Sequence, residues 1–257
     1  MNTVLGTWTL AHRELLRFYR QRSRIVGSLA MPVIVWALLG TGLQAAFPSN
    51  VGSEAREFLK YFFPGNLILT ILFTSIFSTI SVIEDRNEGF LQGVMVSPLS
   101  SLGLILGKVI GGSFIASFQG LIFLLLAPLA GFQLSFSDWV YLSVVIFSVS
   151  FAMTSLGFLF AWKLDSVQGF HAIMNLVLFP MWLLSGAFFP AQSASLFLKP
   201  LILINPLTYG MNALKGALGL AAPVGAIGGQ IGVVWLFGIF FVGSSLLLVN
   251  KKREVTV

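Results

Sequence analysis

The stretch from Trp139 to Trp162 reads WVYLSVVIFSVSFAMTSLGFLFAW and contains no charged side chain. A helix needs about 20 apolar residues to cross the hydrocarbon core of a bilayer, and this stretch has that length. A soluble domain could not carry such a segment on its surface. The stretch therefore predicts a helix that spans a membrane.

Composition extends this prediction to the whole chain. Of the 257 residues, 56% are hydrophobic and only 9% are charged, and the mean hydropathy is +0.92. A soluble domain carries about 25% charged residues, so this chain lacks the polar side chains to cover a solvated surface. The sequence predicts an integral membrane protein and excludes a disordered chain, a nucleic-acid-binding protein and an ordinary soluble enzyme. The net charge of +6 then indicates basic flanks at a membrane surface.

Six stretches are apolar and about long enough to span, although one is slightly short. They are Ile25–Phe47, Phe62–Ile83, Leu102–Gly131, Trp139–Trp162, Ala172–Phe189 and Ile227–Val249. The expected fold is an all-α membrane bundle in one domain over residues 1–257, with its spans within 25–249 and a basic tail over 250–257. Lys108 falls inside the third stretch, and we expect its long side chain to reach the near headgroups.

The distribution of Lys and Arg sets the expected orientation. Basic residues cluster before the first span and after the last, and cytoplasmic flanks are the ones enriched in these residues. Both termini are therefore expected in the cytoplasm. Six spans satisfy this and leave eleven of the 15 Lys and Arg residues on the cytoplasmic side.

The segment Pro190–Ala226 is too apolar for a solvated loop, yet it contains Lys199, Pro200 and Lys215. Charges at mid-bilayer cost about 2.5–3.5 kcal/mol each, which disfavours a seventh span. We expect an external re-entrant hairpin between the fifth and sixth spans.

Residues 1–24 are expected to form an amphipathic helix in the cytoplasmic interface. At 100° per residue, Arg13, Arg17, Arg20 and Arg24 fall within about 60° of one another, opposite an apolar side. Such a helix presents its arginines to anionic headgroups or to a partner.

The closest match to a phosphate-binding loop is Gly103–Val109, and it is a poor one. It has three residues between its glycines instead of four, and Val109 stands where Ser or Thr should hold Mg²⁺. Gly103, Gly107 and Gly111 instead predict a smooth helix face for close packing. The chain has no cysteine, and His12 and His171 are far apart in sequence, so no thiol chemistry or His-rich metal site is indicated.

Ion-coupled carriers usually place acidic residues inside the membrane. In this chain all acidic residues are expected in loops or termini, so an ion-coupled mechanism is disfavoured and any energy would enter from a cytoplasmic partner. These residues are Glu14, Glu54, Glu57, Glu84, Asp85, Glu88, Asp138, Asp165 and Glu254.

The loop after the second span, EDRNEGFLQGVMVSP over Glu84–Pro98, combines a charged front with apolar residues at helical spacing. Phe90, Leu91, Val94 and Met95 form the apolar group, and Pro98 ends the helix. Such a helix either docks its apolar group into a groove of a soluble domain or lies on the membrane as an amphipathic turn.

The run EDRNEGFLQGVMVSPLS resembles the loop after the second span in permeases of the type-2 ATP-binding-cassette (ABC) exporter family. Three further motifs of this sequence are similar to family motifs and occur in the same order. They are Phe62-Phe63-Pro64-Gly65, Trp182-Leu183-Leu184-Ser185-Gly186-Ala187-Phe188-Phe189-Pro190 and Asn205-Pro206-Leu207-Thr208-Tyr209. The resemblance covers nearly the whole chain.

The resemblance implies roles for three groups of residues. A coupling helix that contacts the ATPase would include Glu84, Asp85, Arg86, Glu88, Gly89, Phe90, Leu91, Val94, Ser97 and Pro98. The interfacial helix close to the same ATPase would carry Arg13, Arg17, Arg20 and Arg24. The external hairpin that caps the exit would include Phe188, Phe189, Pro190, Asn205, Pro206 and Tyr209.

The resemblance further implies an export permease of the bacterial inner membrane that is not itself an enzyme. Its partners would be two copies of a separate ABC ATPase, a second permease, identical or related, and membrane lipids, without nucleic acid. ATP and Mg²⁺ would sit on the ATPase, and this chain would bind no cofactor. The cargo would be a hydrophobic or amphiphilic compound such as a drug, a lipid or a lipid-linked glycan. A non-transporting membrane scaffold and an ion-coupled carrier remain as alternatives.

Overall fold

The computed structural model describes residues 3–21, 30, 32–38, 52–187, 195–220 and 227–256, and the regular elements in these ranges are all helices. This confirms the all-α prediction. Five segments are long and apolar enough to cross a membrane. They are Leu59–Asn87, Ser101–Leu124, Phe136–Lys163, Val167–Ala187 and Ile227–Lys251.

The first predicted span, Ile25–Phe47, lies mostly outside the described residues. Residues 32–38 are helical, and Trp36 packs edge-on against Phe63 and Phe123, with ring centroids 5.9 and 6.4 Å apart. This part of the chain is thus in contact with the core of the bundle.

The second span is built from two helices. α3 (Gly52–Ser78) begins well before the predicted start at Phe62, so that Pro64 lies inside it, and α4 (Ile80–Asn87) follows after a break at Thr79. The side chains of α3 from Phe62 to Ile76 are largely buried, which makes α3 the central helix of the bundle.

The next elements are α1 (Thr3–Arg20), the short α5 (Phe90–Val96), α6 (Ser101–Leu124) and α7 (Phe136–Lys163). The third span was predicted to run to Gly131, but α6 ends at Leu124 and a 3-10 turn, η1 (Ala127–Ala130), follows. Pro128 lacks the N–H that would continue the helix, and Gly131 adopts a left-handed conformation with φ 85°.

The last third of the chain contains α8 (Val167–Trp182), which continues as a π-helical turn, η2 (Leu183–Ala187). Two short helices, α9 (Lys199–Ile204) and α10 (Pro206–Ala217), lie within the predicted hairpin. α11 (Ile227–Thr256) ends the chain. The predicted basic tail is therefore the last part of α11, because nothing in its sequence stops the helix at Val249.

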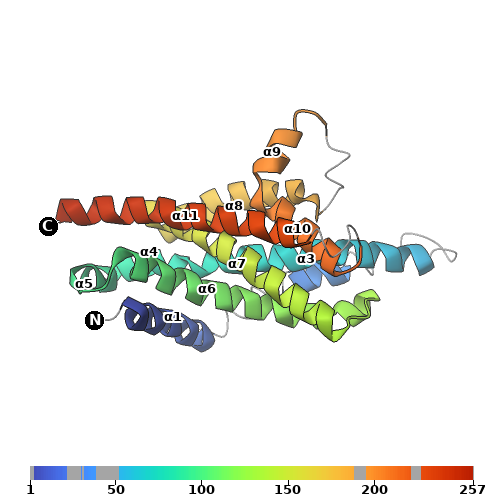
Figure 1. Ribbon diagram of the computed structural model, residues 1–257, viewed down its shortest axis with the longest axis horizontal. Coiled ribbons are helices and arrows are strands. Elements are labelled where there is room, and N and C mark those ends of the chain that lie inside the picture. The colour runs from blue at the N-terminus through green and yellow to red at the C-terminus, as the bar shows by residue number, and fades with distance from the viewer. Residues whose placement is uncertain are drawn as a thin grey trace.

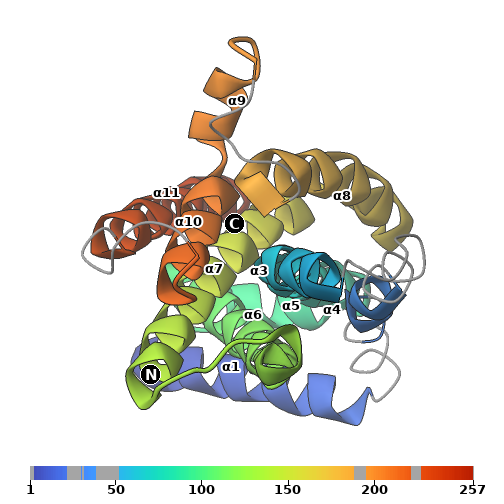
Figure 2. The ribbon, with the colours of Figure 1, turned by 90° about the vertical axis from the view of Figure 1, so that its right-hand side faces the viewer.

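The helices surround α3, as Figure 2 shows along the bundle, with α6 and α7 as its main neighbours. α1 packs along α6, and α11 packs along α7 with most of its surface exposed. α5, the start of α1 and the C-terminal end of α11 lie at the same end of the bundle (Figure 1), and α9 projects from the side opposite α1.

Candidate functional site

Asp85, near the end of α4, is the centre of a buried ion cluster. Its carboxylate accepts hydrogen bonds from the two terminal nitrogens of Arg13, at 2.8 and 2.9 Å, and from Arg17 Nη1 at 2.8 Å. The Lys108 ammonium also donates to it. The Asp85 side chain is 0% exposed, so cations from α1 and α6 replace the water that an ionised carboxylate loses on burial.

Lys108, in the second turn of α6, is held from another side by Glu14 of α1. Its Nζ lies 2.6 Å from Glu14 Oε1 and 3.3 Å from Ser81 Oγ, and its side chain is only 2% exposed. The prediction that Lys108 reaches the headgroups is therefore wrong. The placement of Asp85 in a loop is also wrong, since it lies on α4 within the second span. Glu14 lies on the predicted N-terminal helix, but it is buried beside Lys108 instead of facing solvent.

The glycine stripe of α6 lets α1 come close enough to form this cluster. A Cβ on Gly107 would lie 2.7 Å from Leu10 Cβ and 3.0 Å from the Thr7 carbonyl oxygen, and one on Gly111 would lie 2.8 Å from Glu14 Cβ. These distances are too short for any side chain. They confirm the predicted smooth face and identify α1 as the helix that packs on it.

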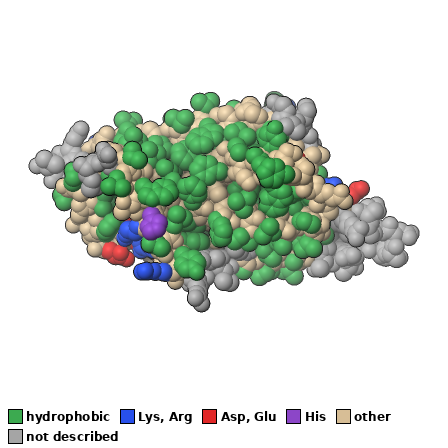
Figure 3. Space-filling model, turned by 60° about the horizontal axis from the view of Figure 1, so that its bottom comes forward, with side chains coloured by type: hydrophobic (Ala, Val, Ile, Leu, Met, Phe, Trp, Pro, Cys, Tyr) green, Lys and Arg blue, Asp and Glu red, His purple; other side chains and the backbone are tan. Residues whose placement is uncertain are grey.

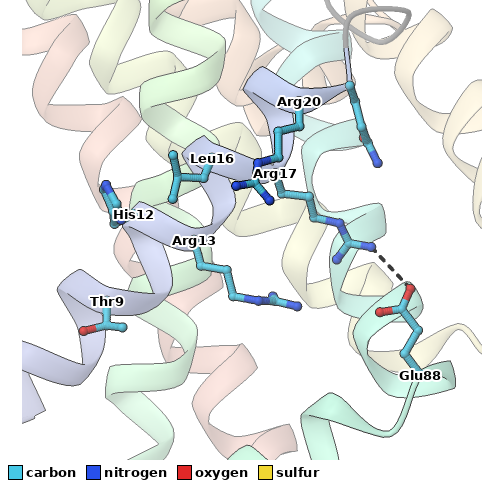
Figure 4. A pocket seen from close by; sticks show the side chains of 8 residues that line it. Thr9, His12, Arg13, Leu16, Arg17, Arg20 and Glu88 are labelled. Carbon is cyan, nitrogen blue, oxygen red and sulfur yellow. Dashed lines mark ion pairs between the residues drawn. The ribbon is translucent and has the colours of Figure 1, made fainter.

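Two of the four arginines predicted to point at headgroups or a partner instead bind acids of their own chain. Hydrogen bonding to Asp85 raises the pKa of the Arg13 guanidinium above its ordinary value. Arg17 Nη2 lies 2.9 Å from Glu84 and 3.6 Å from Glu88. Figure 4 shows Arg17 reaching from α1 toward Glu88.

The other two arginines of that group have different positions. Arg20 is exposed at the C-terminal end of α1, one turn beyond Arg17. Arg24 lies outside the described residues. The predicted basic face is thus divided between a buried cluster and an exposed end.

α5 is the short helix expected in the loop after the second span. Gly89 precedes it in a left-handed conformation, with φ 78°, which is why glycine stands at this turn. The guanidinium of Arg13 lies over the Phe90 ring, 3.8 Å from its centroid. Arg13 therefore links Asp85 of α4 to the first residue of α5.

The apolar group of this loop faces its own chain rather than outward. Leu91 is 2% exposed, and Phe90, Val94 and Met95 are partly buried against the core. Of the two alternatives given for these four side chains, a groove of a soluble domain or the membrane surface, neither describes their packing against their own chain. The exposed outer surface of the loop consists of Asn87, Glu88, Gln92, Gly93, Val96 and Pro98.

Ser97 and Arg86 fix the ends of the loop. Ser97 Oγ donates to the Val94 carbonyl at 2.7 Å and closes α5 before Pro98. Arg86 donates to the Trp162 carbonyl oxygen at 2.7 Å and to the carbonyls of Ala161 and Leu164 at 3.2 and 3.1 Å. It also lies 3.1 Å from the exposed Asp165. Because these carbonyls end α7, Arg86 ties the loop to the connection between α7 and α8.

The described residues of the predicted external hairpin are held by bonds within the chain. Asn205 Nδ2 donates to the Met181 carbonyl at 2.7 Å, and its Oδ1 accepts from the Leu207 amide at 3.0 Å. Pro206 is the first residue of α10, and Tyr209 donates to the Leu203 carbonyl at 2.9 Å. The remaining predicted hairpin residues, Phe188, Phe189 and Pro190, lie outside the described residues.

Sequence reasoning missed two anchors that hold this region. Trp182 Nε1 donates to the Gly65 carbonyl of α3 at 2.8 Å. Lys215 Nζ donates to the Gly186 carbonyl at 2.6 Å, and burial lowers the pKa of Lys215 below its ordinary value. The available signal was a lone lysine in an apolar helix, which needs a polar partner.

The polar residues of the spans have different surroundings. Asn66 and Gln119 are fully buried inside the bundle, and Thr74 donates to Gln119 from α3 to α6. Asn175 lies on the exposed side of α8. Within the described ranges, no three His, Asp or Glu side chains gather in a way that could hold a metal ion.

Comparison with known proteins places this chain in a family. The family model described as ABC-2 type transporter matches residues 6–219. Nodulation protein J of Neorhizobium galegae is 27% identical over 90% of this chain and 87% of its own length. The protein named "Putative transport permease ycf38" of Cyanophora paradoxa is 24% identical over 81% of this chain and 72% of its own. The "Probable multidrug ABC transporter permease YbhR" of Escherichia coli K12 is 28% identical over 58% of this chain and 41% of its own.

Proposed function

From the premise that this chain belongs to the ABC-2 type transporter family and is a multi-pass membrane transport permease subunit, we propose that it works as the permease of an ATP-driven exporter. Family membership implies an ABC ATPase component as its partner. Membrane subunits of this kind are generally non-catalytic, so hydrolysis would belong to the ATPase, which would carry the ATP and Mg²⁺ while this chain binds no cofactor.

The observation that carries the proposal is the connection between α5 and the rest of the bundle. The exposed side of α5 is free to meet a soluble partner, while its inner side is held by Leu91 and by the contact between Phe90 and Arg13. Arg13 also binds Asp85, and Lys108 joins Asp85 to α6. A push on α5 would therefore move α1, α4 and α6 together, because these contacts are short and at least partly buried.

In the complete transporter we place two copies of this permease, or this chain and a relative, with two ATPase chains. α5, the start of α1 and the C-terminal end of α11 share one end of the bundle, which supports cytoplasmic termini and a sixth span over Ile25–Phe47 (Figure 1). α9 and α10 would form the external re-entrant hairpin, anchored by Asn205 and Lys215. The bacterial inner membrane is the proposed location.

We assign the cargo only to a chemical class, a hydrophobic or amphiphilic compound such as a drug, a lipid or a lipid-linked glycan. The wide apolar faces of α8 and α11, with Leu176, Phe179, Leu236 and Phe240 exposed, would accept such a compound from the membrane. The relative from E. coli is named for multidrug transport, which agrees with this class. Alternating access would release the cargo outward when ATPase closure separates the two bundles.

The test is retention of an ATPase by the tagged permease, purified gently from its own host membranes. Val96 is 86% exposed at the end of α5, and Val96→Asp places a charge on the proposed docking surface. Leu196→Asp is the matched control, since Leu196 is 82% exposed next to α9, away from α5. We expect the ATPase to remain with the control and to be lost from Val96→Asp.

Two outcomes would contradict the proposal. A permease that purifies without an ATPase under several mild conditions would favour a scaffold or an ion-coupled carrier. Equal retention of the ATPase by the Val96→Asp and Leu196→Asp variants would show that α5 is not the docking element. A carrier would then be recognised by transport that follows an ion gradient without ATP.

A further inference from the structure

A pocket of about 510 Å³ lies on the outer side of α1, and most of its polar lining is basic. Its wall is formed by side chains on successive turns of α1 and by one residue of the neighbouring loop (Figure 4). The residues that matter here are His12, Arg13, Leu16, Arg17, Arg20 and Glu88. Thr9 and Gln21 complete the lining and add polar groups.

The basic side chains of this pocket differ in whether another group of the chain already pairs with them. Arg13 and Arg17 are bound by Asp85 and its acidic neighbours. The side chains of Arg20 and His12, both exposed, make no ion pair or hydrogen bond within the described part of the chain. Glu88 is the one acid in the lining; it is 60% exposed and already lies 3.6 Å from Arg17. The pocket thus retains positive charge that no group of the described chain neutralises.

An apolar surface adjoins this basic pocket on the same helix. Val4, Leu5, Trp8 and Tyr19 are 61–80% exposed, and Leu16, which lines the pocket, is 45% exposed. Figure 3 shows the same arrangement on the face that carries α1, where Lys and Arg side chains and a His gather at the edge of a largely hydrophobic surface. A soluble partner seated on the basic pocket would leave these apolar side chains in water.

We propose that this pocket binds the headgroup phosphate of an anionic phospholipid, whose acyl chains lie against Trp8 and Leu16. The phosphate would be held by Arg20 together with His12. This inference rests on the proposed function in one respect, that this end of the bundle lies at the cytoplasmic membrane surface. The match is one of charge and polarity, since an anionic headgroup on apolar chains meets a basic pocket beside an apolar face.

The experiment measures lipid retained by the permease alone, by native mass spectrometry. Detergent-purified protein is mixed with phosphatidylglycerol or with phosphatidylcholine of the same chains. Wild type should retain phosphatidylglycerol in preference, and removing the Arg20 charge with Arg20→Gln should weaken that retention by about fivefold. His12→Gln should weaken it further through the lost hydrogen bond, and neither substitution should affect phosphatidylcholine. Lys163→Gln, an exposed cation at the end of α7, is the matched control and should behave as wild type. Raised salt should reduce the preference.

Equal binding of both lipids, or unchanged phosphatidylglycerol binding in the Arg20 and His12 variants, would overturn the proposal. Competition by millimolar inorganic phosphate as strong as that by the lipid would show a free-anion site and would also overturn it. Loss of the ATPase with full lipid binding in these variants would assign the pocket to the protein partner. Because the measurement uses no ATPase, its failure is separate from failure of the Val96→Asp test.

Discussion

Asp85→Asn is the substitution with the sharpest expected effect, because among the described residues only Asp85 touches all three cations of the cluster. The change keeps the shape of the side chain and removes its charge. Removing one partner of a buried ion pair costs about 3–5 kcal/mol. Arg13 and Arg17 are 33% and 20% exposed and can recover water, and Lys108 keeps Glu14. We therefore take the low end, about 3 kcal/mol, as the loss in the docking free energy of α1.

The chain contains no cysteine, so a single introduced cysteine reports local opening without background. Ala11 is 2% exposed in the contact between α1 and α6. In an Ala11→Cys background, a loss of about 3 kcal/mol should raise the maleimide-labelling rate by about a hundredfold at equal reagent.

Asp165→Asn is the matched control for this measurement. Asp165 also pairs with an arginine, Arg86, but its side chain is 92% exposed, and exposed pairs contribute little. Labelling in this control should stay within a fewfold of the parent. The reasoning about the cluster would be refuted by similar labelling rates in the Asp85 and Asp165 variants.

Three further predictions concern packing, capping and pH. Gly107→Ala should weaken the docking of α1 by about 1–3 kcal/mol in the same labelling assay, because the new Cβ meets a backbone oxygen. Gly232→Ala is the control and should have no effect, since nothing lies within 4 Å of a Cβ at that position. Asn205→Ala should lower thermal stability by about 1–2 kcal/mol through loss of the α10 cap, and the exposed Asn212→Ala should leave it unchanged. Burial lowers the pKa of Lys215 in the folded protein, so the unfolded chain binds more protons at this site. The free energy of unfolding should therefore rise with pH until the pH reaches the ordinary lysine pKa of 10.5. Lys215→Met should remove that part of the pH slope, and an identical slope in both proteins would contradict the assignment.

Part of the candidate site was predictable from local pattern. The apolar spacing from Phe90 onward and Pro98 indicated a short helix, and α5 lies there. Local pattern could not tell which side of that helix faces the bundle, because the apolar side of an amphipathic helix suits a partner and its own core equally. The structure shows that the apolar side faces the bundle, because Leu91 is buried there.

The ends of several helices were also set by context. The apolar stretch beginning at Leu102 continues through η1, and hydropathy alone therefore extended the third span beyond Leu124. α3 begins earlier than its apolar stretch, since charged residues before Phe62 continue the helix outside the apolar window. Hydropathy reports which residues tolerate lipid, whereas helix ends depend on where backbone groups find other partners.

The sequence by itself determined that this chain is a helical membrane protein and where most of its apolar segments lie, because the energy of burying charge in lipid acts on each segment separately. It also determined the smooth face of α6, since a row of glycines has no other use on such a helix. Only the tertiary structure decided that Glu14, Asp85 and Lys108 are buried together in one ion cluster. These residues lie far apart in the chain, and whether a charge is exposed or buried depends on which helices are brought beside it.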